Sequence, residues 1–595
     1  MKIHSLLSLL AFGLTATSLQ AVDQYWDLNG ATAGSGGATP IGTWDTSTAN
    51  WSPDPLGTRP VTIWGNGNTA VFSAGSDATG LFTVTVAAVG AGGIRIEEGS
   101  VQLTGGNVSM AAGTITLNSG TVLTLDSKTR VTTSGGILTL NGGMLRQTDP
   151  TSGVFISGLS SITIGAAGGT LDTSTGAGIQ STFTGTITGA GNTLTKTGAG
   201  EFRYFGANFS GTTYAKLVVN QGLFSLGNTA NNSEVGFGAA PASFTADAIT
   251  LAGGGQIGVN FTNAPTLNAN RGITLGAGGG GFAMSGGAMS VAGVISGSGG
   301  LTVTGGTQPL NLLGVNTFTG GFTMNGGGNV NVGSTGRLSG VGPVTITSGT
   351  LSLSNAATTI TALSGAGNLT FRNGHVLTVD NTSATIFGGV IAGTGGLIKN
   401  GVETLTLAGG SANTFSGSIR INDGKIIAGK ASALGSGNAL ILAGGTFDTG
   451  GFNQAMGTLD LDAISTLDLG AGTSALTFAN SSALDWGGFT LHILNWTVGS
   501  DALRFGVDNA GLTGVQLSEI FFDNFGEGAK MNSSGFVLPV SVPEASPFAL
   551  FGLGLLMLAV GRRLFWRVRL SRFTDLPLPP FLACVEDRTL PMRVA

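Results

Sequence analysis

The sequence has few of the residues that catalysis, metal binding and disulfide bonding require. Its 595 residues include one cysteine, Cys584, and three histidines. Only 9% of the residues are charged, against about 25% in ordinary globular proteins. A single cysteine excludes an internal disulfide and a metal cluster of the CxxC type. The formal net charge of −5 offers no basic patch, so we expect no nucleic-acid partner.

Glycine and apolar residues are abundant instead. The chain contains 105 glycines, and 41% of its residues are hydrophobic. Such a glycine content also occurs in disordered chains, but here the apolar residues alternate regularly with Thr and Ser. Leu123 and Leu125, and then Leu138 and Leu140, occupy every second position, so one face of each strand is buried. New strands begin roughly every eight residues, with Gly, Asn or Ser between them. This pattern predicts an all-β protein with many short strands.

A long motif occurs three times in the chain. It begins at Gly185 as GTITGAGNTLTK, at Gly293 as GVISGSGGLTVT and at Gly389 as GVIAGTGGLIK. Each copy continues into a second alternating strand and ends in NFSG or NTF[ST]G. Repetition of this kind predicts a solenoid, in which each unit buries its apolar face against the next unit. A propeller or an antiparallel sandwich requires longer strands and a more regular blade or hairpin signal.

The composition divides the chain into six segments. The first 21 residues have a lysine, an apolar stretch and small residues, as a secretory signal peptide does. Four of the seven tryptophans follow, and we interpret them as a cover over the first coil, with an exposed sugar-binding surface as the alternative. A second cap, formed of longer strands, is expected at the other end. The expected segments are 1–21 (signal peptide), 22–98 (N-terminal cap), 99–472 (β-helix), 473–540 (C-terminal cap), 541–572 (sorting signal with a single apolar helix) and 573–595 (tail).

The repeats resemble the autotransporter-associated β-strand repeat of bacterial surface proteins. The resemblance covers most of residues 99–472 and implies a right-handed parallel β-helix. The matching residues are the corners Gly189-Ala190-Gly191, Gly297-Ser298-Gly299 and Gly393-Thr394-Gly395, then Lys196 and Lys399, and the endings Asn208, Phe209 and Gly211; Asn316, Phe318 and Gly320; and Asn413, Phe415 and Gly417. An autotransporter also ends in a membrane barrel of amphipathic strands, and no such C-terminal pattern is present in this sequence.

The C-terminal region resembles the PEP-CTERM sorting signal. Its three parts are Val542-Pro543-Glu544, the apolar run 548–560, and Arg562-Arg563. Ala545 stands where the motif usually has a second proline, and the tail 573–595 follows where such proteins normally stop. The resemblance implies an exosortase-type processing enzyme as partner, in a Gram-negative bacterium with abundant exopolysaccharide. We expect a transient anchor in the inner membrane, because the run is short for a permanent span and arginines mark the cytoplasmic side.

No constellation of catalytic residues is evident in the sequence. Glycosidase or lyase chemistry requires paired carboxylates, or a base with a charge-stabilising partner. The candidates are isolated or alternate with leucine on a strand, where we expect a solvated face. They are Asp460, Asp462 and Asp468, the neighbours Glu97 and Glu98, and the separate histidines His375 and His492.

The sequence therefore predicts an exported, non-enzymatic solenoid of the structural or adhesion type, held at the cell surface or in the extracellular matrix. No cofactor or metal is expected. A polysaccharide-binding or polysaccharide-degrading β-helix is the alternative. Carboxylates gathered on one face of the helix would favour an enzyme, and a row of exposed, coplanar tryptophans would favour a carbohydrate-binding protein.

Overall fold

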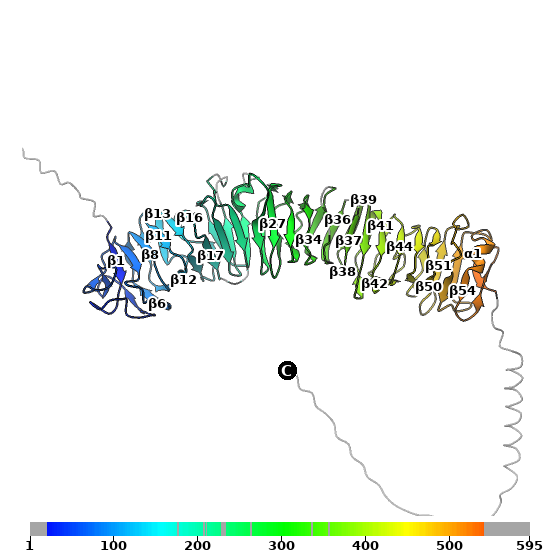
Figure 1. Ribbon diagram of the computed structural model, residues 1–595, viewed down its shortest axis with the longest axis horizontal. Helices are drawn as coiled ribbons and strands as arrows, with labels where there is room; N and C mark the ends of the chain where they lie inside the picture. Colours follow the sequence, from blue (N-terminus) through cyan, green and yellow to red (C-terminus); the bar gives the residue numbers. More distant parts are fainter. Residues whose placement is uncertain are drawn as a thin grey trace, which may run out of the picture.

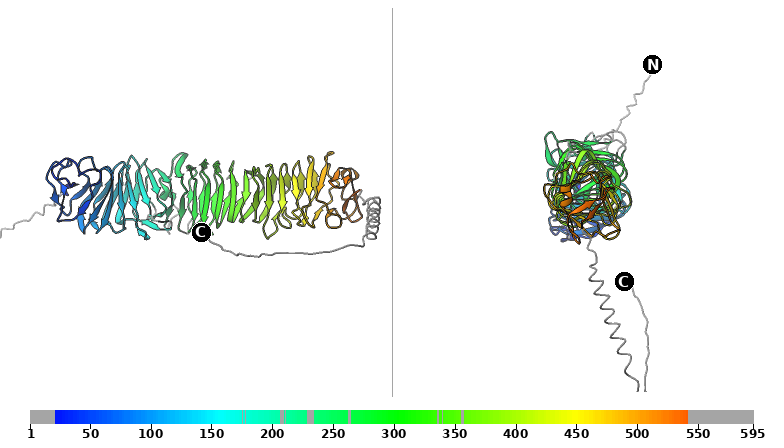
Figure 2. Two further views of the ribbon diagram at one scale, coloured as in Figure 1. Left: turned by 90° about the horizontal axis from the view of Figure 1, so that it is seen from below. Right: turned by 90° about the vertical axis from the view of Figure 1, so that its right-hand side faces the viewer.

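The computed structural model describes residues 21–540, except 175, 177, 206–208, 210, 228–233, 262–263, 335–336, 339 and 355–356. The described chain forms an elongated rod of stacked coils, a parallel β-solenoid of about 18 turns (Figure 1). Seen along its axis the rod is narrow (Figure 2). The all-β class and the parallel solenoid predicted from the sequence are confirmed. The expected apolar helix of the sorting signal lies outside the described residues.

Two 11-stranded sheets form sides of the N-terminal half. The first contains β1 (Asp23–Trp26), β3 (Ala49–Ser52), β4 (Thr62–Ile63), β5 (Thr69–Phe72), β7 (Val89–Ala91), β8 (Gly93–Ile96), β10 (Val108–Met110), β11 (Thr114–Leu117), β13 (Val131–Leu140), β16 (Ser157–Ile164) and β19 (Thr186–Thr188). The second contains β2 (Gly42–Trp44), β6 (Leu81–Val86), β9 (Ser100–Gly105), β12 (Val122–Leu125), β14 (Met144–Gln147), β17 (Gly169–Thr173), β20 (Thr193–Thr197), β22 (Lys216–Val219), β24 (Thr245–Leu251), β27 (Arg271–Leu275) and β30 (Ile295–Gly297).

A 20-stranded sheet continues through the middle of the rod. It contains β15 (Gly153–Val154), β18 (Gln180–Phe183), β21 (Glu201–Tyr204), β23 (Leu223–Leu226), β25 (Gly255–Val259), β26 (Thr266–Leu267), β28 (Gly280–Met284), β29 (Met289–Val291), β31 (Leu301–Gly305), β32 (Leu310–Leu312), β34 (Phe322–Val332), β36 (Pro343–Leu353), β37 (Ala357–Ile360), β38 (Ala362–Ser364), β39 (Asn368–Val379), β41 (Ile391–Lys399), β43 (Thr414–Phe415), β44 (Ile419–Ile421), β46 (Leu440–Leu442) and β49 (Leu459–Leu461).

Smaller sheets complete the C-terminal half. An eight-stranded sheet contains β40 (Thr385–Phe387), β42 (Thr404–Leu407), β45 (Lys425–Ala428), β47 (Thr446–Asp448), β50 (Ser465–Asp468), β52 (Leu491–Leu494), β54 (Ile520–Phe522) and β55 (Gly526–Glu527). The remaining pairings join β33 (Val315–Asn316) to β35 (Arg337–Leu338), β48 (Gln454–Ala455) to β51 (Ala475–Phe478) and β53 (Ala502–Phe505), and β56 (Ala529–Met531) to β57 (Val537–Pro539). The described helices are η1 (Glu234–Phe237), a 3₁₀ turn, and α1 (Gly514–Ser518).

The register of the ladders explains the alternation in the sequence. Leu103 of β9 pairs with Leu125 of β12, and Leu125 pairs with Gln147 of β14, so each of these turns advances the chain by 22 residues (125 − 103 and 147 − 125). Because residues in register face the same side of a sheet, the leucines of successive coils stack inside the rod. Leu103 and Leu125 are accordingly buried. Each backbone N–H and C=O in the middle of a sheet pairs with the coil above or below.

The N-terminal end is closed by antiparallel strands and tryptophans. β3 pairs antiparallel with β1 and with β4, outside the first parallel coil. The parallel ladders begin before residue 99, because β5 pairs in parallel with both β1 and β8.

The C-terminal cap contains short strands, so the expectation of longer strands there is wrong. The strands β52 to β57 have two to four residues each, and α1 lies among them. Four aromatic residues of this segment, Trp486, Trp496, Phe505 and Phe522, are buried and close the last coils. Trp486 lies 6.4 Å from Phe505, and Trp496 lies 5.3 Å from Phe522, between ring centroids.

The glycine of the repeated corner is required by close approach of two coils. Gly393, the second glycine of GVIAG, has a φ of 93°, and a Cβ there would lie 1.9 Å from the carbonyl oxygen of Phe371 in the preceding coil. Gly297 has the same role in the second repeat, with a φ of 111° and the carbonyl oxygen of Leu275 at 2.3 Å. Any other residue at these corners would be strained and would displace the neighbouring coil.

The lysines of the repeat lie inside the rod. Lys196 and Lys399 are both fully buried. The Lys196 Nζ donates hydrogen bonds to the carbonyl oxygens of Thr197 (2.7 Å), Gly198 (2.8 Å) and, one coil onward, Gln221 (3.2 Å). Lys399 donates to the carbonyls of Gly401 and, one coil onward, Asp423. In both repeats the ammonium group therefore satisfies carbonyl groups at a corner where the backbone leaves the sheet.

Candidate functional site

The aspartates of the TLDLDAISTLDL stretch do not share one solvated face. Asp462 is exposed and forms an ion pair with Arg420, and Asp460 is partly buried. Asp468 is only 6% exposed, so the expectation of a solvated side chain is wrong for this residue. It still points away from the core, but side chains from neighbouring coils cover it.

A partly buried ion-pair cluster surrounds Asp468. The Lys425 Nζ lies 3.1 Å from a carboxylate oxygen of Asp448 and 3.2 Å from one of Asp468, and the Asn495 amide donates to Asp468 at 2.5 Å. Burial raises the pKa of the Asp468 carboxyl, but hydrogen bonds from Asn495 and Gly470 and the contact with Lys425 outweigh it and leave the pKa below its usual value. The ionised Asp468 is therefore a structural partner of Lys425 and unsuited to the role of a general acid, which requires a raised pKa.

The other acidic candidates are also separated. Glu97 forms an ion pair with Arg95 at 2.7 Å, whereas Glu98 accepts a hydrogen bond from the Ser73 hydroxyl at 2.7 Å. Burial raises the pKa of the Glu98 carboxyl, and the nearby carboxylates of Asp77 and Glu97 raise it further.

The two histidines lie in different environments. His375 is buried beside the ring of Phe371, and His492 is partly exposed with its Nδ1 3.4 Å from Asp523. Within residues 21–540, excluding the undescribed positions, no group of three or more His, Cys, Asp or Glu residues is arranged to hold a metal ion.

The N-terminal tryptophans form a buried cluster. Trp26, Trp44 and Trp51 are 0% exposed and Trp64 is 2% exposed. Trp51 lies at the centre, with ring centroids 5.2 Å from Trp26, 5.3 Å from Trp44, 4.6 Å from Trp64 and 5.5 Å from Phe72. Rings at these distances and tilts pack as a small core. This arrangement is that of a cover over the first coil and presents no row of exposed rings to a sugar.

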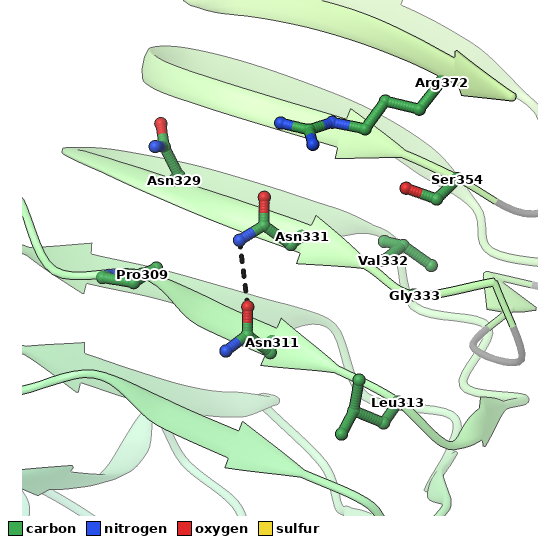
Figure 3. Close-up of a pocket in the computed structure, with 9 residues that line it drawn as sticks. All are labelled: Pro309, Asn311, Leu313, Asn329, Asn331, Val332, Gly333, Ser354 and Arg372. Atoms are coloured by element: carbon green, nitrogen blue, oxygen red, sulfur yellow. Dashed lines mark hydrogen bonds between the residues drawn. The ribbon is translucent and has the colours of Figure 1, made fainter. Parts of the chain in front are cut away.

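A groove lined by both polar and apolar side chains lies on the outer face of the 20-stranded sheet (Figure 3). Its cavity volume is about 350 Å³, and its walls come from four neighbouring coils. The strands β32, β34, β36 and β39 provide the lining, because the register places Asn311 beside Asn331 and Asn331 beside Ser352. The lining residues are Pro309, Asn311, Leu313, Asn329, Asn331, Val332, Gly333, Ser354 and Arg372.

A ladder of side-chain amides forms the floor of the groove. The Asn331 Nδ2 donates to the Asn311 Oδ1 at 2.9 Å, and the Asn311 Nδ2 donates to the Ser290 hydroxyl at 3.1 Å. These bonds run along the rod axis and fix the orientation of both amides. The asparagine side chains therefore present a fixed set of hydrogen-bonding groups to solvent.

Arg372 supplies the charge of the groove. Figure 3 shows its side chain extending over the groove in the direction of Asn329. Arg372 is exposed and, among the described residues, has no ion pair or hydrogen bond. The lining contains no acidic residue, so the guanidinium gives the groove a net positive charge.

The sequence interpretation did not identify this groove. The alternation in GNVNVG places Asn329 and Asn331 outward and Val330 and Val332 inward, which was the available signal. Arg372 lies 41 positions after Asn331 (372 − 331), and only the stacking of coils brings the two residues to the same groove.

The residues of the sorting signal, Val542, Pro543, Glu544, Arg562 and Arg563, lie outside the described residues. Their role therefore stays a prediction. Among the residues that the structure describes, no helix has both the length and the apolar character needed to cross a membrane.

A short segment of the chain is similar to an adhesin. Over 71 residues, or 11% of this chain, the sequence is 44% identical to the Adhesin BmaC autotransporter of Brucella suis biovar 1 (strain 1330). The match covers 2% of that protein's length. No family model and no solved structure matches the chain.

Proposed function

We propose that the protein is an exported, non-enzymatic β-solenoid of the structural or adhesion type that acts at the cell surface or in the extracellular matrix. The observation that carries this proposal is the long rod of stacked parallel coils that the described residues form. A long rigid rod with a polar outer face suits the display of binding surfaces away from a cell. The similarity of a short segment to an autotransporter adhesin supports the same function.

Three features support the non-enzymatic part of the proposal. The carboxylates of Asp448 and Asp468 are held by one lysine, Glu97 is paired with Arg95, and the described tryptophans are buried. The purified protein should therefore cleave no exopolysaccharide. Reproducible cleavage that is lost in a variant lacking one carboxylate, such as Asp468→Asn, would overturn this part.

The proposed route to the surface uses the PEP-CTERM signal. The apolar run 548–560 would hold a precursor in the inner membrane with Arg562 and Arg563 on the cytoplasmic side, and an exosortase-type enzyme would cleave near Glu544. Release would then deliver the rod to the surface, where exopolysaccharide is the proposed partner polymer.

Cell fractionation and mass spectrometry test this route. In the producing bacterium, the protein should appear at the cell surface, and deletion of the processing enzyme should retain it in the inner membrane. Surface-released material should contain no peptide that extends past Arg563. The variant Glu544→Ala should accumulate as precursor, whereas Glu527→Ala, an exposed glutamate of the cap, should be processed normally. Peptides beyond Arg563 in released protein would refute cleavage near Glu544.

A further inference from the structure

The groove over the amide ladder offers hydrogen-bonding groups that the fold does not use. Within the described residues, the Arg372 guanidinium and the Asn329 amide have no hydrogen-bond partner, and both side chains are exposed. The Asn331 amide is oriented by its bond to Asn311, which leaves its Oδ1 available as an acceptor. The Asn331 amide is already held in position, so it loses little freedom when a ligand binds, whereas the exposed side chains of Arg372 and Asn329 become ordered only on binding.

The charge of the groove favours an anionic ligand. Arg372 has no neutralising carboxylate in the lining, and its planar guanidinium matches the two oxygens of a carboxylate. The neighbouring amides and the Ser354 hydroxyl donate and accept hydrogen bonds, as a ligand rich in hydroxyl groups requires.

The shape of the groove favours a linear chain over a protein surface. Its lining contains no aromatic side chain and its arginine is exposed, whereas the anchors of protein-binding surfaces are aromatic or arginine side chains in fully desolvated pockets. The strands β34 and β36 are paired on both sides, so no free edge is available for an added strand. The equivalent amides of Asn311 and Asn331 lie one coil apart, at about 4.8 Å, which is close to the length of one sugar unit.

We infer that this groove binds a carboxylate-bearing polysaccharide, with one uronate carboxylate on Arg372 and the sugar hydroxyls on Asn329, Asn331 and Ser354. The apolar atoms of Pro309 and Leu313 at the edge of the groove contact the C–H face of a ring. This inference deepens the proposed surface function and rests on it, because the ligand is a polymer found outside the cell.

The inference can be tested by measuring how polymers bind to the purified full-length chain. The measurements are made in detergent and at about 0.15 M salt. Polygalacturonate is the probe, and dextran and sulfated dextran are the comparison polymers. We expect polygalacturonate to bind more tightly than either polymer. Arg372→Ala should weaken this binding about 10-fold or more, since a hydrogen bond to a charged group is lost. Arg372→Lys should be intermediate, because lysine keeps the charge without the planar fork.

Two further variants separate the groove from general effects of charge. Asn329→Ala should weaken polygalacturonate binding a few-fold. Arg59→Ala, which removes an exposed arginine at the N-terminal end, should leave the affinity unchanged. Absence of polygalacturonate binding, equal binding of either comparison polymer, or full affinity in Arg372→Ala would each overturn the inference. Surface display of the Arg372→Ala protein, measured by fractionation, reports separately on the proposed function, since that variant should be exported normally.

Discussion

The side-chain amide of Asn413 and the backbone N–H of Ile391 join two consecutive coils, because the Asn413 Oδ1 accepts a hydrogen bond from this N–H at 2.9 Å. Asn316 makes the same bond with Ile295, also at 2.9 Å. Both asparagines are buried. In the second and third repeats the asparagine of the ending therefore satisfies the isoleucine N–H of the G-x-I corner in the coil before it. In the first repeat the Ile187 N–H donates to the Tyr204 hydroxyl at 3.3 Å.

Asn413→Ala should reveal the role of this side chain, which also accepts a hydrogen bond from the Lys430 Nζ at 3.0 Å and donates one to the Ala433 carbonyl at 2.6 Å. The Ile391 N–H would lose its partner inside the rod, and an unsatisfied buried donor costs about 1–3 kcal/mol. Hydrogen exchange measured by mass spectrometry should show faster exchange around Ile391 and unchanged exchange around Ile295. Asn316→Ala should give the reverse pattern. Asn329→Ala, at an exposed position, is the control and should alter neither segment. Equal exchange at both corners in all three variants would contradict the assigned role.

The phenylalanine of each repeat was predictable as a core residue. Phe209, Phe318 and Phe415 stand in related contexts in the sequence and are all at most 1% exposed in the structure. Alternation and repetition can be seen in short stretches of the sequence. They therefore predicted the fold class and the side of most strands that faces the core. The contact between Asn413 and Ile391 was not predictable, because it depends on the number of residues in the intervening coil.

Phe415→Ala should destabilise the rod by about 3–5 kcal/mol, the usual range for a buried phenylalanine. Phe415 lies in the core and packs edge-on against Phe371 at 5.9 Å, so the truncation leaves a cavity between two coils. Urea unfolding followed by circular dichroism measures the effect. Phe452→Ala is the matched control, since Phe452 is 42% exposed and should lose less than about 1 kcal/mol. If Phe415→Ala lowered the free energy of unfolding by as little as the control, the side chain would be exposed or its neighbours would fill the cavity.

Exposure of outward-facing charged residues was less predictable. Asp468 follows the same alternation as Asp462, yet Lys425 and Asn495 cover Asp468, and these residues are 43 and 27 positions away in the sequence. The groove was not predictable for the same reason, because only the stacking of coils brings Arg372 and Asn331 together. The exposure of an outward-facing residue depends on which side chains flank it in the next coil. Those neighbours can be named only when the register of the turns is known.

The stability of the protein should depend on the protonation of Lys196. Burial lowers the pKa of the Lys196 ammonium from 10.5 to about 7. Between these pH values the unfolded chain binds more protons than the folded chain, so the free energy of unfolding rises with pH in this window. The slope is at most about 1.4 kcal/mol per pH unit, and the three carbonyl acceptors, which favour the charged form, should reduce it.

Urea unfolding at pH 7 and pH 9 tests this dependence. The native protein should be more stable at pH 9, and Lys196→Met should show a smaller increase. Part of the increase should remain, because burial also lowers the pKa of Lys399. Lys530→Met is the control, since Lys530 is exposed and its replacement should keep the increase. An identical rise in the Lys196→Met protein would assign the pH dependence to other groups.

The buried tryptophan cluster should act as a cover and not as a sugar site. Trp51 contacts three other tryptophans and Phe72, so Trp51→Ala should create a cavity over the first coil and cost about 3–5 kcal/mol. Hydrogen exchange should accelerate in β1 and β5 and stay unchanged in β52 at the far end, because each coil contacts only its neighbours. Leu56→Ala, which removes a side chain 62% exposed at the same end, should change neither region.

Neutral or acidic polysaccharides should leave the fluorescence of these tryptophans unaltered. Saturable quenching that disappears in Trp51→Ala, without loss of the folded first coil, would instead identify this end as a carbohydrate-binding surface.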